Sequence, residues 1–158
     1  MPRAMSPSPD PRVVQVRRAL GRLCTRGLLR YWIRSRAGPL LDLRCVQERA
    51  TKLLNSPGSP IDLNDSDGGP EALIEILREQ VGGMRRSQVE KEEGKLLWIV
   101  LGLDPRFADK SAWVRREAAG REFRGGEATV LAGTIRQLHE PRALDALTSR
   151  LLTYEDGR

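Results

Sequence analysis

Two neighbouring side chains near the C-terminal end of the sequence could read the edges of nucleic-acid bases. Arg136 and Gln137 follow one another in an apolar-periodic segment, residues 134–138. An arginine guanidinium can donate two hydrogen bonds to guanine, and a glutamine amide can exchange two with adenine. We therefore predict that Arg136 and Gln137 contact bases of double-stranded DNA. Phosphate contacts are predicted beside them from Arg115, Arg116, Arg121, Arg124 and Thr134.

A second set of basic side chains lies near the start of the chain. Residues 11–41 contain eight arginines and no acidic residue. Five of these arginines are spaced by four residues and should follow one helical face: Arg18, Arg22, Arg26, Arg30 and Arg34. Because like charges on one face repel, they need a compensating charge. Three sources are open: the chain's own acids, a nucleic acid, or an anionic membrane or partner groove. Tyr31 and Trp32 support the nucleic acid, since bases stack on aromatic rings.

Side chains typical of catalysis do not form a recognisable set. His139 is the single histidine of the chain, which excludes a metal site built on several histidines. Gly125 and Gly126 are not followed by the Lys-Ser/Thr pair of a phosphate-binding loop. We therefore predict a protein without enzymatic activity, cofactor, metal or small-molecule substrate. His139 is interpreted as a polar cap or surface residue, with pH sensing as the alternative.

One acidic stretch approaches a metal-binding pattern. Residues 55–69 form a loop by their turn signals, and Asp62, Asp65 and Asp67 within it have spacing close to that of a calcium loop. The terminal glutamate and the ordered ligand series of such a loop are missing. We interpret these aspartates as a solvated loop, or as ion-pair partners of the arginine-rich helix.

The composition is that of a basic chain with a modest apolar content. Its 158 residues carry a formal net charge of +6, and 39% of them are hydrophobic, which predicts one domain with a thin core. No stretch approaches 18 consecutive apolar residues, and the N-terminal stretch lacks the apolar region of a signal peptide. Cys24 and Cys45 are expected to be buried free thiols. These features predict a cytoplasmic protein without membrane contact. The excess of arginine over lysine suggests a high-GC bacterium.

Apolar residues recur at helical spacing along most of the chain, which predicts an all-α protein of six or seven short helices. We expect helices over residues 13–36 and 40–54, separated by a Gly-Pro pair, and over 71–81, where two glycines interrupt the pattern. The apolar run 96–101 is also expected to be helical, since its neighbours are not strand-like. The predicted organisation is a disordered tail (1–12), an arginine-rich helical segment (13–54), a loop (55–70), a helical domain (71–152) and a tail (153–158).

Two helices joined by a glycine-containing turn are expected within residues 94–152. Ser111 is a favourable N-cap for the first helix, and residues 124–126 supply the turn. The start of the second helix has two interpretations. It begins near Thr129 after a short turn, or it has residues 134–138 as its core, behind about five extra turn residues.

The stretches LGLDPRFADKSAWVRREAAGREF and TIRQLHEPRALDALTSRLL carry a familiar pattern. Over about residues 94–152, roughly one third of the chain, it resembles a small helical module found near the ends of many uncharacterised actinobacterial proteins. It is also similar to the helix-turn-helix of sigma-factor region 4. The resemblance implies DNA binding or transcription regulation. The longer turn before Thr134 is a departure from this pattern.

Together these features predict a small DNA-binding or transcription-regulatory protein. The alternative is a protein-interaction adaptor that uses the same helices without touching DNA, because a fold does not fix a function. The sequence leaves the oligomeric state open.

Overall fold

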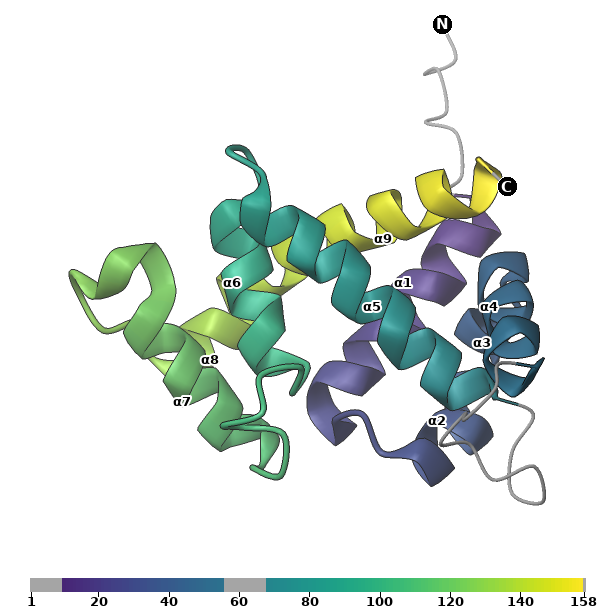
Figure 1. Ribbon diagram of the computed structural model, residues 1–158. Coiled ribbons are helices and arrows are strands. Elements are labelled where there is room, and N and C mark those ends of the chain that lie inside the picture. The colour runs from purple at the N-terminus through teal and green to yellow at the C-terminus, as the bar shows by residue number, and fades with distance from the viewer. Residues whose placement is uncertain (1–9, 56–67, 158) are drawn as a thin grey trace, which may run out of the picture.

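The computed structural model describes residues 10–55 and 68–157, in which the chain is all-α and has no strand, as the sequence predicts. The predicted metal-like aspartates, Asp62, Asp65 and Asp67, lie outside the described residues. Seven described helices are at least seven residues long (Figure 1): α1 (Pro11–Arg26), α2 (Arg30–Arg36), α4 (Arg44–Asn55), α5 (Gly69–Arg86), α6 (Lys91–Val100), α7 (Ala112–Glu122) and α9 (Glu140–Asp156). Two single turns, α3 (Gly38–Leu41) and α8 (Ala132–Thr134), lie between them.

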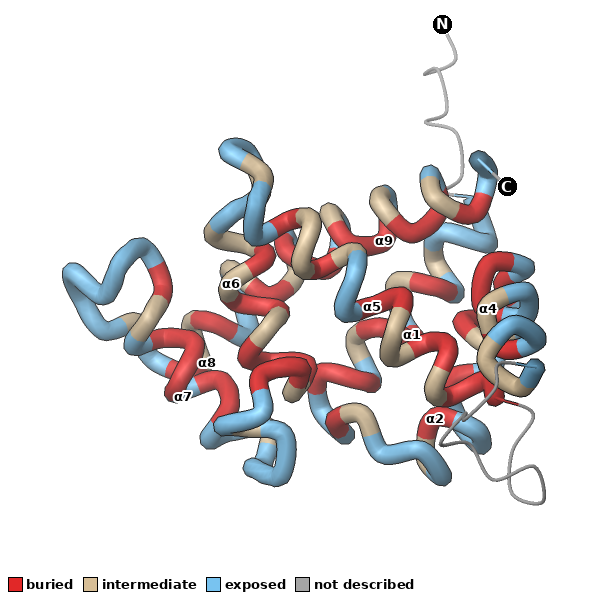
Figure 2. Tube along the Cα trace, in the orientation of Figure 1, coloured by how far each residue is buried: buried red, intermediate tan, exposed pale blue. Residues whose placement is uncertain are grey.

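The long helix α5 runs through the middle of the molecule, between α6 and the α2–α4 region (Figure 1). Leu73, Ile76, Leu77, Val81 and Met84 recur at three- and four-residue spacing along it, and all five are buried. Helices α1 and α9 pack against each other, and the start of α1 lies beside the end of α9. Figure 2 shows the buried residues on the inward sides of these helices. Burial of these apolar faces is the main force that holds the helices together.

The arginine-rich segment does not form a separate unit. Buried hydrophobic residues from Val16 in α1 to Leu152 in α9 belong to one cluster. Both predicted segments, 13–54 and 71–152, contribute to this cluster, so the two share one core. The charged faces of α1 and α2 are therefore held in place by the same packing that fixes the C-terminal helices.

Several helix boundaries differ from the sequence prediction. The helix expected over residues 13–36 breaks after Arg26, where Gly27 adopts a φ of +80° and redirects the chain into α2. The helix expected over residues 40–54 is divided into α3 and α4. Conversely, α5 continues through its two glycines to Arg86. The buried side chain of Met84 explains this continuation, since packing outweighs a glycine penalty of about 1 kcal/mol per residue.

Residues 10–12 and 153–156, which were predicted as parts of the two tails, belong to helices or to a helix cap. Asp10 caps α1 by accepting a hydrogen bond from the Arg12 N–H at 2.9 Å, so the helix begins at Pro11. At the other end, α9 continues to Asp156, and the Glu155 carboxylate within it is buried. It accepts hydrogen bonds from the backbone N–H groups of Arg44 and Cys45, at 2.7 and 2.9 Å. Glu155 thus satisfies the first N–H groups of α4 and is part of the fold, not of a separate tail.

The C-terminal helices form only a loose version of a helix-turn-helix. Ser111 caps α7 as predicted and accepts a hydrogen bond from the Val114 N–H at 3.3 Å. Residues 123–131 then separate α7 from α8, a longer connection than the usual turn of three or four residues. The helix after them starts at Ala132, which confirms the later of the two predicted registers. From α8 the chain passes through a π-helical segment, Ile135–His139, directly into α9.

Candidate nucleic-acid interface

A groove with a volume of about 920 Å³ lies between α1 and α2. From α1 it is lined by Arg17, Arg18, Gly21, Arg22, Thr25 and Arg26, which are two residues from each of three successive turns. From α2 it is lined by Tyr31, Trp32, Ser35 and Arg36. We call this feature the arginine groove. No acidic side chain of the described residues lines it.

The charges of the arginine groove are largely uncompensated. Arg17 forms an ion pair with Asp145 of α9, Nε to Oδ1 at 2.9 Å. The other four arginines have no ion-pair partner among the described residues: Arg18, Arg22, Arg26 and Arg36. All four are exposed to solvent. Clustered cations between low-dielectric walls raise the local concentration of anions, so the groove is suited to a polyanion.

The arginine groove exists because the chain turns back after α1. Gly27 has a left-handed backbone conformation, and its N–H caps α1 by donating to the Leu23 carbonyl at 2.7 Å. The Arg115 guanidinium donates to the Cys24 carbonyl at 2.8 Å and so holds the last turn of α1 from the other side. Buried Ile33 anchors the inner face of α2 in the core. These contacts fix the two walls of the groove relative to each other.

The predicted five-arginine face is only partly present. Arg18, Arg22 and Arg26 lie together in the groove as expected. Arg30 and Arg34 do not line it. The break at Gly27 ends the four-residue series of α1, and the residues of α2 that line the groove are Tyr31, Trp32, Ser35 and Arg36 instead. Arg30 instead pairs with Glu71 of α5, Nε to Oε1 at 3.1 Å, so here the chain's own acid supplies the compensating charge.

Arg17 and Arg36 are groove residues that the spacing argument missed. Arg17 is outside the i, i+4 series of the predicted stripe, and Arg36 joins the others only through the fold of α2 back toward α1. The excess of arginines in residues 11–41 was the one sequence signal that included Arg17 and Arg36. It marks the whole segment as basic but does not show which side chains share a face.

The residues predicted to contact DNA in the C-terminal region are divided between the surface and the interior. Arg136 and Gln137 are exposed on the π-helical segment. Arg121 and Arg124 are also exposed, and Thr134 is half-buried. These five positions remain compatible with contact to an external ligand, and their roles stay predictions.

Arg115 and Arg116 are not available for phosphate contact, which corrects the sequence prediction. Their side chains lie on the inner face of α7, with only 3% and 5% of each residue exposed. Arg116 is held there by the buried carboxylate of Glu140, Nε to Oε2 at 2.8 Å. Adjacent arginines on a charged helix normally indicate a solvated face, so the sequence alone offers no sign of this inward orientation.

Arg115 connects three parts of the fold through backbone carbonyls. Its guanidinium donates to Cys24, near the end of α1, to Val100, the last residue of α6, at 2.7 Å, and to Lys110, just before α7. A cation is favoured where the carbonyl ends of two helices meet, because the helix dipoles are negative there. Burial lowers the pKa of the Arg115 guanidinium. The role of Arg115 is therefore to position α1, α6 and α7.

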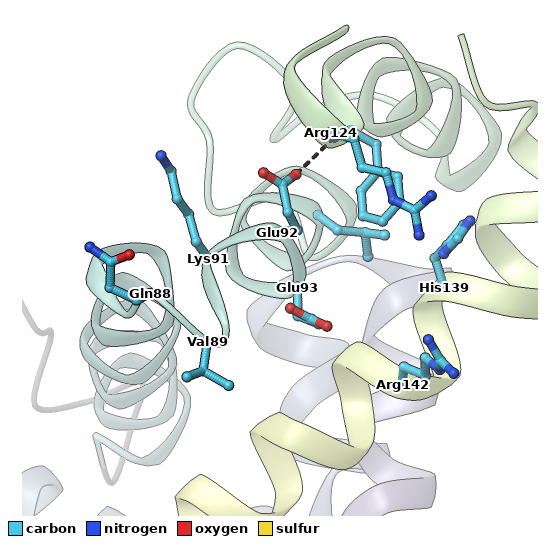
Figure 3. Close-up of a pocket in the computed structure, with 10 residues that line it drawn as sticks. Gln88, Val89, Lys91, Glu92, Glu93, Arg124, His139 and Arg142 are labelled. Atoms are coloured by element: carbon cyan, nitrogen blue, oxygen red, sulfur yellow. Dashed lines mark hydrogen bonds between the residues drawn. The ribbon is translucent and has the colours of Figure 1, made fainter. Parts of the chain in front are cut away.

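A smaller pocket of about 300 Å³ lies beside the start of α6 (Figure 3). Arg124, in a left-handed conformation at φ 54°, donates its backbone N–H to the Glu92 carboxylate at 2.8 Å. The His139 ring packs on the Phe123 ring, with centroids 4.4 Å apart.

The charges around this pocket are mixed. Burial, together with the charges of Arg124 and Arg142, lowers the pKa of His139. Figure 3 shows Glu92 and Glu93 between Lys91 and these basic side chains. Acids and bases therefore face each other here, unlike in the arginine groove.

An apolar groove of about 600 Å³ lies between α7 and the start of α8. Trp113 of α7 and Leu131 before α8 line it, and they are 55% and 73% exposed. Glu117 and Arg121 continue the α7 side of this groove. Large exposed apolar residues that gather at one site are typical of surfaces that bind another molecule.

Other classes of site find little support in the described residues. There, no cluster of three or more histidine, cysteine, aspartate or glutamate residues has the arrangement of a metal site. Cys24 and Cys45 are buried free thiols, as predicted. Burial raises the pKa of the Cys24 thiol well above its ordinary value, and a protonated thiol is a poor nucleophile. None of the helices in the described ranges is long and apolar enough to cross a membrane.

The fold and the groove place this chain in a general class, that of small all-α proteins with an arginine-lined surface groove. No family model, curated protein or solved structure matches it. The resemblance of residues 94–152 to a helix-turn-helix module therefore stays a prediction.

Proposed function

We propose that this protein binds nucleic acid and that the arginine groove holds the phosphate backbone. The observation that carries this proposal is the convergence of five arginines from two helices on one groove that no described acidic side chain lines. Four of the five have no ion pair with a described residue. A structural role would account for arginines paired within the fold, as Arg30 is with Glu71.

Phosphate groups are the ligands that best match this surface. Guanidinium groups donate two parallel hydrogen bonds to a phosphate, and several phosphates in a row engage several arginines at once. Binding also releases the counterions condensed on the nucleic acid, which contributes favourably at low salt. Arginines repeated on successive turns of α1 therefore fit a repeating polyanion better than a single small anion.

The C-terminal unit has a secondary role in this proposal. Arg136 and Gln137 are proposed to contact bases, with Arg121 and Arg124 on nearby phosphates, and their exposure supports these assignments. The long connection at residues 123–131 sets this unit apart from a standard helix-turn-helix. The arginine groove accordingly supplies most of the attraction, and the C-terminal unit supplies sequence preference.

A salt titration of nucleic-acid binding tests the proposal. We expect the logarithm of the association constant to fall linearly with the logarithm of the salt concentration, with a slope of about −3 for three to four phosphate contacts. Arg22→Gln should reduce this slope by about 1. Arg34→Gln is the matched control, because Arg34 is exposed but does not line the groove, and its slope should equal that of the wild type. A slope near zero, or equal effects of the two substitutions, would overturn the proposal.

A protein-interaction adaptor is the second candidate, favoured by the apolar groove beside α7. The exposed indole of Trp113 and the exposed side chain of Leu131 are suited to cover by a protein partner. In this case Trp113→Ser should abolish capture of the partner from a cell extract and leave nucleic-acid affinity unchanged. Loss of nucleic-acid affinity in Trp113→Ser would instead assign this groove to the nucleic-acid surface.

A further inference from the structure

We infer that the arginine groove takes single-stranded nucleic acid, with bases inserted between the arginine wall and the aromatic wall. This inference rests on the proposed function and specifies which form of nucleic acid the groove recognises. It follows from the different chemistry of the two walls, each of which matches a different part of a single strand.

The α1 wall consists of two rows of side chains, one of long basic residues and one that is small after its first residue. Arg18, Arg22 and Arg26 follow one another at intervals of about 6 Å along the axis, since each helical residue rises about 1.5 Å. The neighbouring row on the same wall contains Gly21 and Thr25 after Arg17. The side chains in this second row become small where those in the first stay long. The Arg17 guanidinium reaches over Gly21, with its Nη1 3.5 Å from the position of a Cβ there. Thr25 is exposed, so the open part of the groove lies beside Arg22 and Arg26, and there we expect a base of the bound strand to fit.

The α2 wall contributes two aromatic side chains to the groove. Tyr31 is 75% exposed although it lines the groove, and Trp32 also lines it while packing partly on the core. No arginine of the described residues stacks on either ring. Elsewhere in the fold, the Trp98 ring is covered by Arg85, whose guanidinium carbon lies 4.4 Å from the ring centroid. The Tyr31 ring is thus open to stack with a flat ligand, and Trp32 adds the part of its ring that is not packed on the core.

A duplex cannot use both walls at once. In a duplex the base faces are stacked within the helix, so only phosphates and base edges reach a protein surface. A single strand exposes both its phosphates and its base faces, and stacking of bases on aromatic side chains is a general mode of single-strand binding. The arginines would bind either form, whereas Tyr31 and Trp32 gain contacts only with unstacked bases.

Four probes of similar phosphate number separate these forms: an oligothymidylate and an oligouridylate of about 12 nucleotides, a duplex and inorganic polyphosphate. Fluorescence anisotropy of labelled oligothymidylate, with the others as competitors, gives the affinities. We expect the two single strands to bind at least about fivefold more tightly than duplex or polyphosphate, from stacking of one or more bases. Unequal affinity of the two strands would identify DNA or RNA as the preferred source.

Substitution of Tyr31 tests the aromatic wall, and the fold should tolerate the change because this side chain is largely exposed. Tyr31→Ala should weaken single-strand binding by about fivefold or more, whereas affinity for polyphosphate should remain within about twofold of the wild type. Tyr31→Phe, which keeps the ring, should retain single-strand affinity. Thr25→Leu fills the space beside the arginine row. It should likewise lower the affinity for single strands and leave the affinity for polyphosphate unchanged.

The outcomes distinguish this inference from the proposed function. Equal or tighter binding of duplex, or unchanged single-strand affinity in Tyr31→Ala, would overturn the single-strand inference while leaving nucleic-acid binding in place. Absence of salt-dependent binding to all four probes would overturn the proposed function itself.

Discussion

Arg116 and Glu140 form a two-point ion pair inside the protein, with Nε to Oε2 at 2.8 Å and Nη2 to Oε1 at 2.9 Å. The pair joins the inner face of α7 to the first residue of α9. Both side chains are buried, and the hydrogen bonds with Glu140 raise the pKa of the Arg116 guanidinium. This pair fixes the angle between the two long helices of the C-terminal unit. The Arg116–Glu140 pair thereby also positions the exposed residues of the π-helical segment, which lies between α7 and α9.

Removal of one partner of this pair should destabilise the fold strongly. In Glu140→Gln the Arg116 charge stays buried without a carboxylate, and we expect the free energy of unfolding to fall by about 3–5 kcal/mol. The double variant Arg116→Met, Glu140→Met should recover most of this loss, because it buries no unpaired charge. Urea denaturation followed by circular dichroism measures both. A loss below about 1 kcal/mol for Glu140→Gln would show that the pair is not buried in solution.

Gly120 permits the connection after α7 to fold back on that helix. The Val130 N–H donates to the Gly120 carbonyl at 2.9 Å, and a Cβ at position 120 would lie 1.9 Å from the Val130 carbonyl oxygen. Gly120→Ala should therefore lower the thermal midpoint markedly, by displacing residues 123–131. Gly133→Ala is the matched control, since a Cβ there meets no atom within 4 Å. It should be neutral or stabilise the protein by up to about 1 kcal/mol. Similar midpoints for the two variants would contradict this account.

The lowered pKa of His139 predicts a pH-dependent stability. Burial and the nearby Arg124 and Arg142 disfavour its protonated form in the folded state. As the pH falls below about 6.5, the unfolded chain binds this proton first, so the contribution of His139 is present above that pH and is lost below it. We expect the free energy of unfolding to decrease between about pH 7.5 and pH 5.5, and to decrease less in His139→Gln. Parallel pH profiles for the two proteins would exclude this effect.

Arg136 allows the C-terminal unit to be tested apart from the arginine groove. If its exposed guanidinium contacts a base, Arg136→Ala should reduce binding to a preferred site, obtained by selection from random sequences, by about 1–3 kcal/mol. Binding to unrelated sequences should change little, because phosphate contacts carry no sequence information. Equal losses on all sequences would assign Arg136 to phosphate contact.

Local features were well predicted where a short segment is sufficient to define them. The Ser111 cap and the helical character of residues 96–101 follow from side-chain chemistry and spacing within a few residues, and the structure confirms both. The burial of Cys24 and Cys45 was also predicted, since free cysteine is among the residue types most often found in protein interiors. Helix ends were less predictable, because packing of Met84 and Glu155 extends α5 and α9 beyond their local signals.

The sequence by itself determined that the chain is all-α and that its positive charge is concentrated in residues 11–41, since periodicity and composition are local properties. Only the tertiary structure decided what each arginine does. It buried Arg115 and Arg116, paired Arg30 with Glu71, and brought Arg36 to the groove lined by Arg22. The physical reason is that a guanidinium is stable either in water or against buried oxygens. Whether a given arginine is solvated or held by buried oxygens depends on residues that are distant in the sequence.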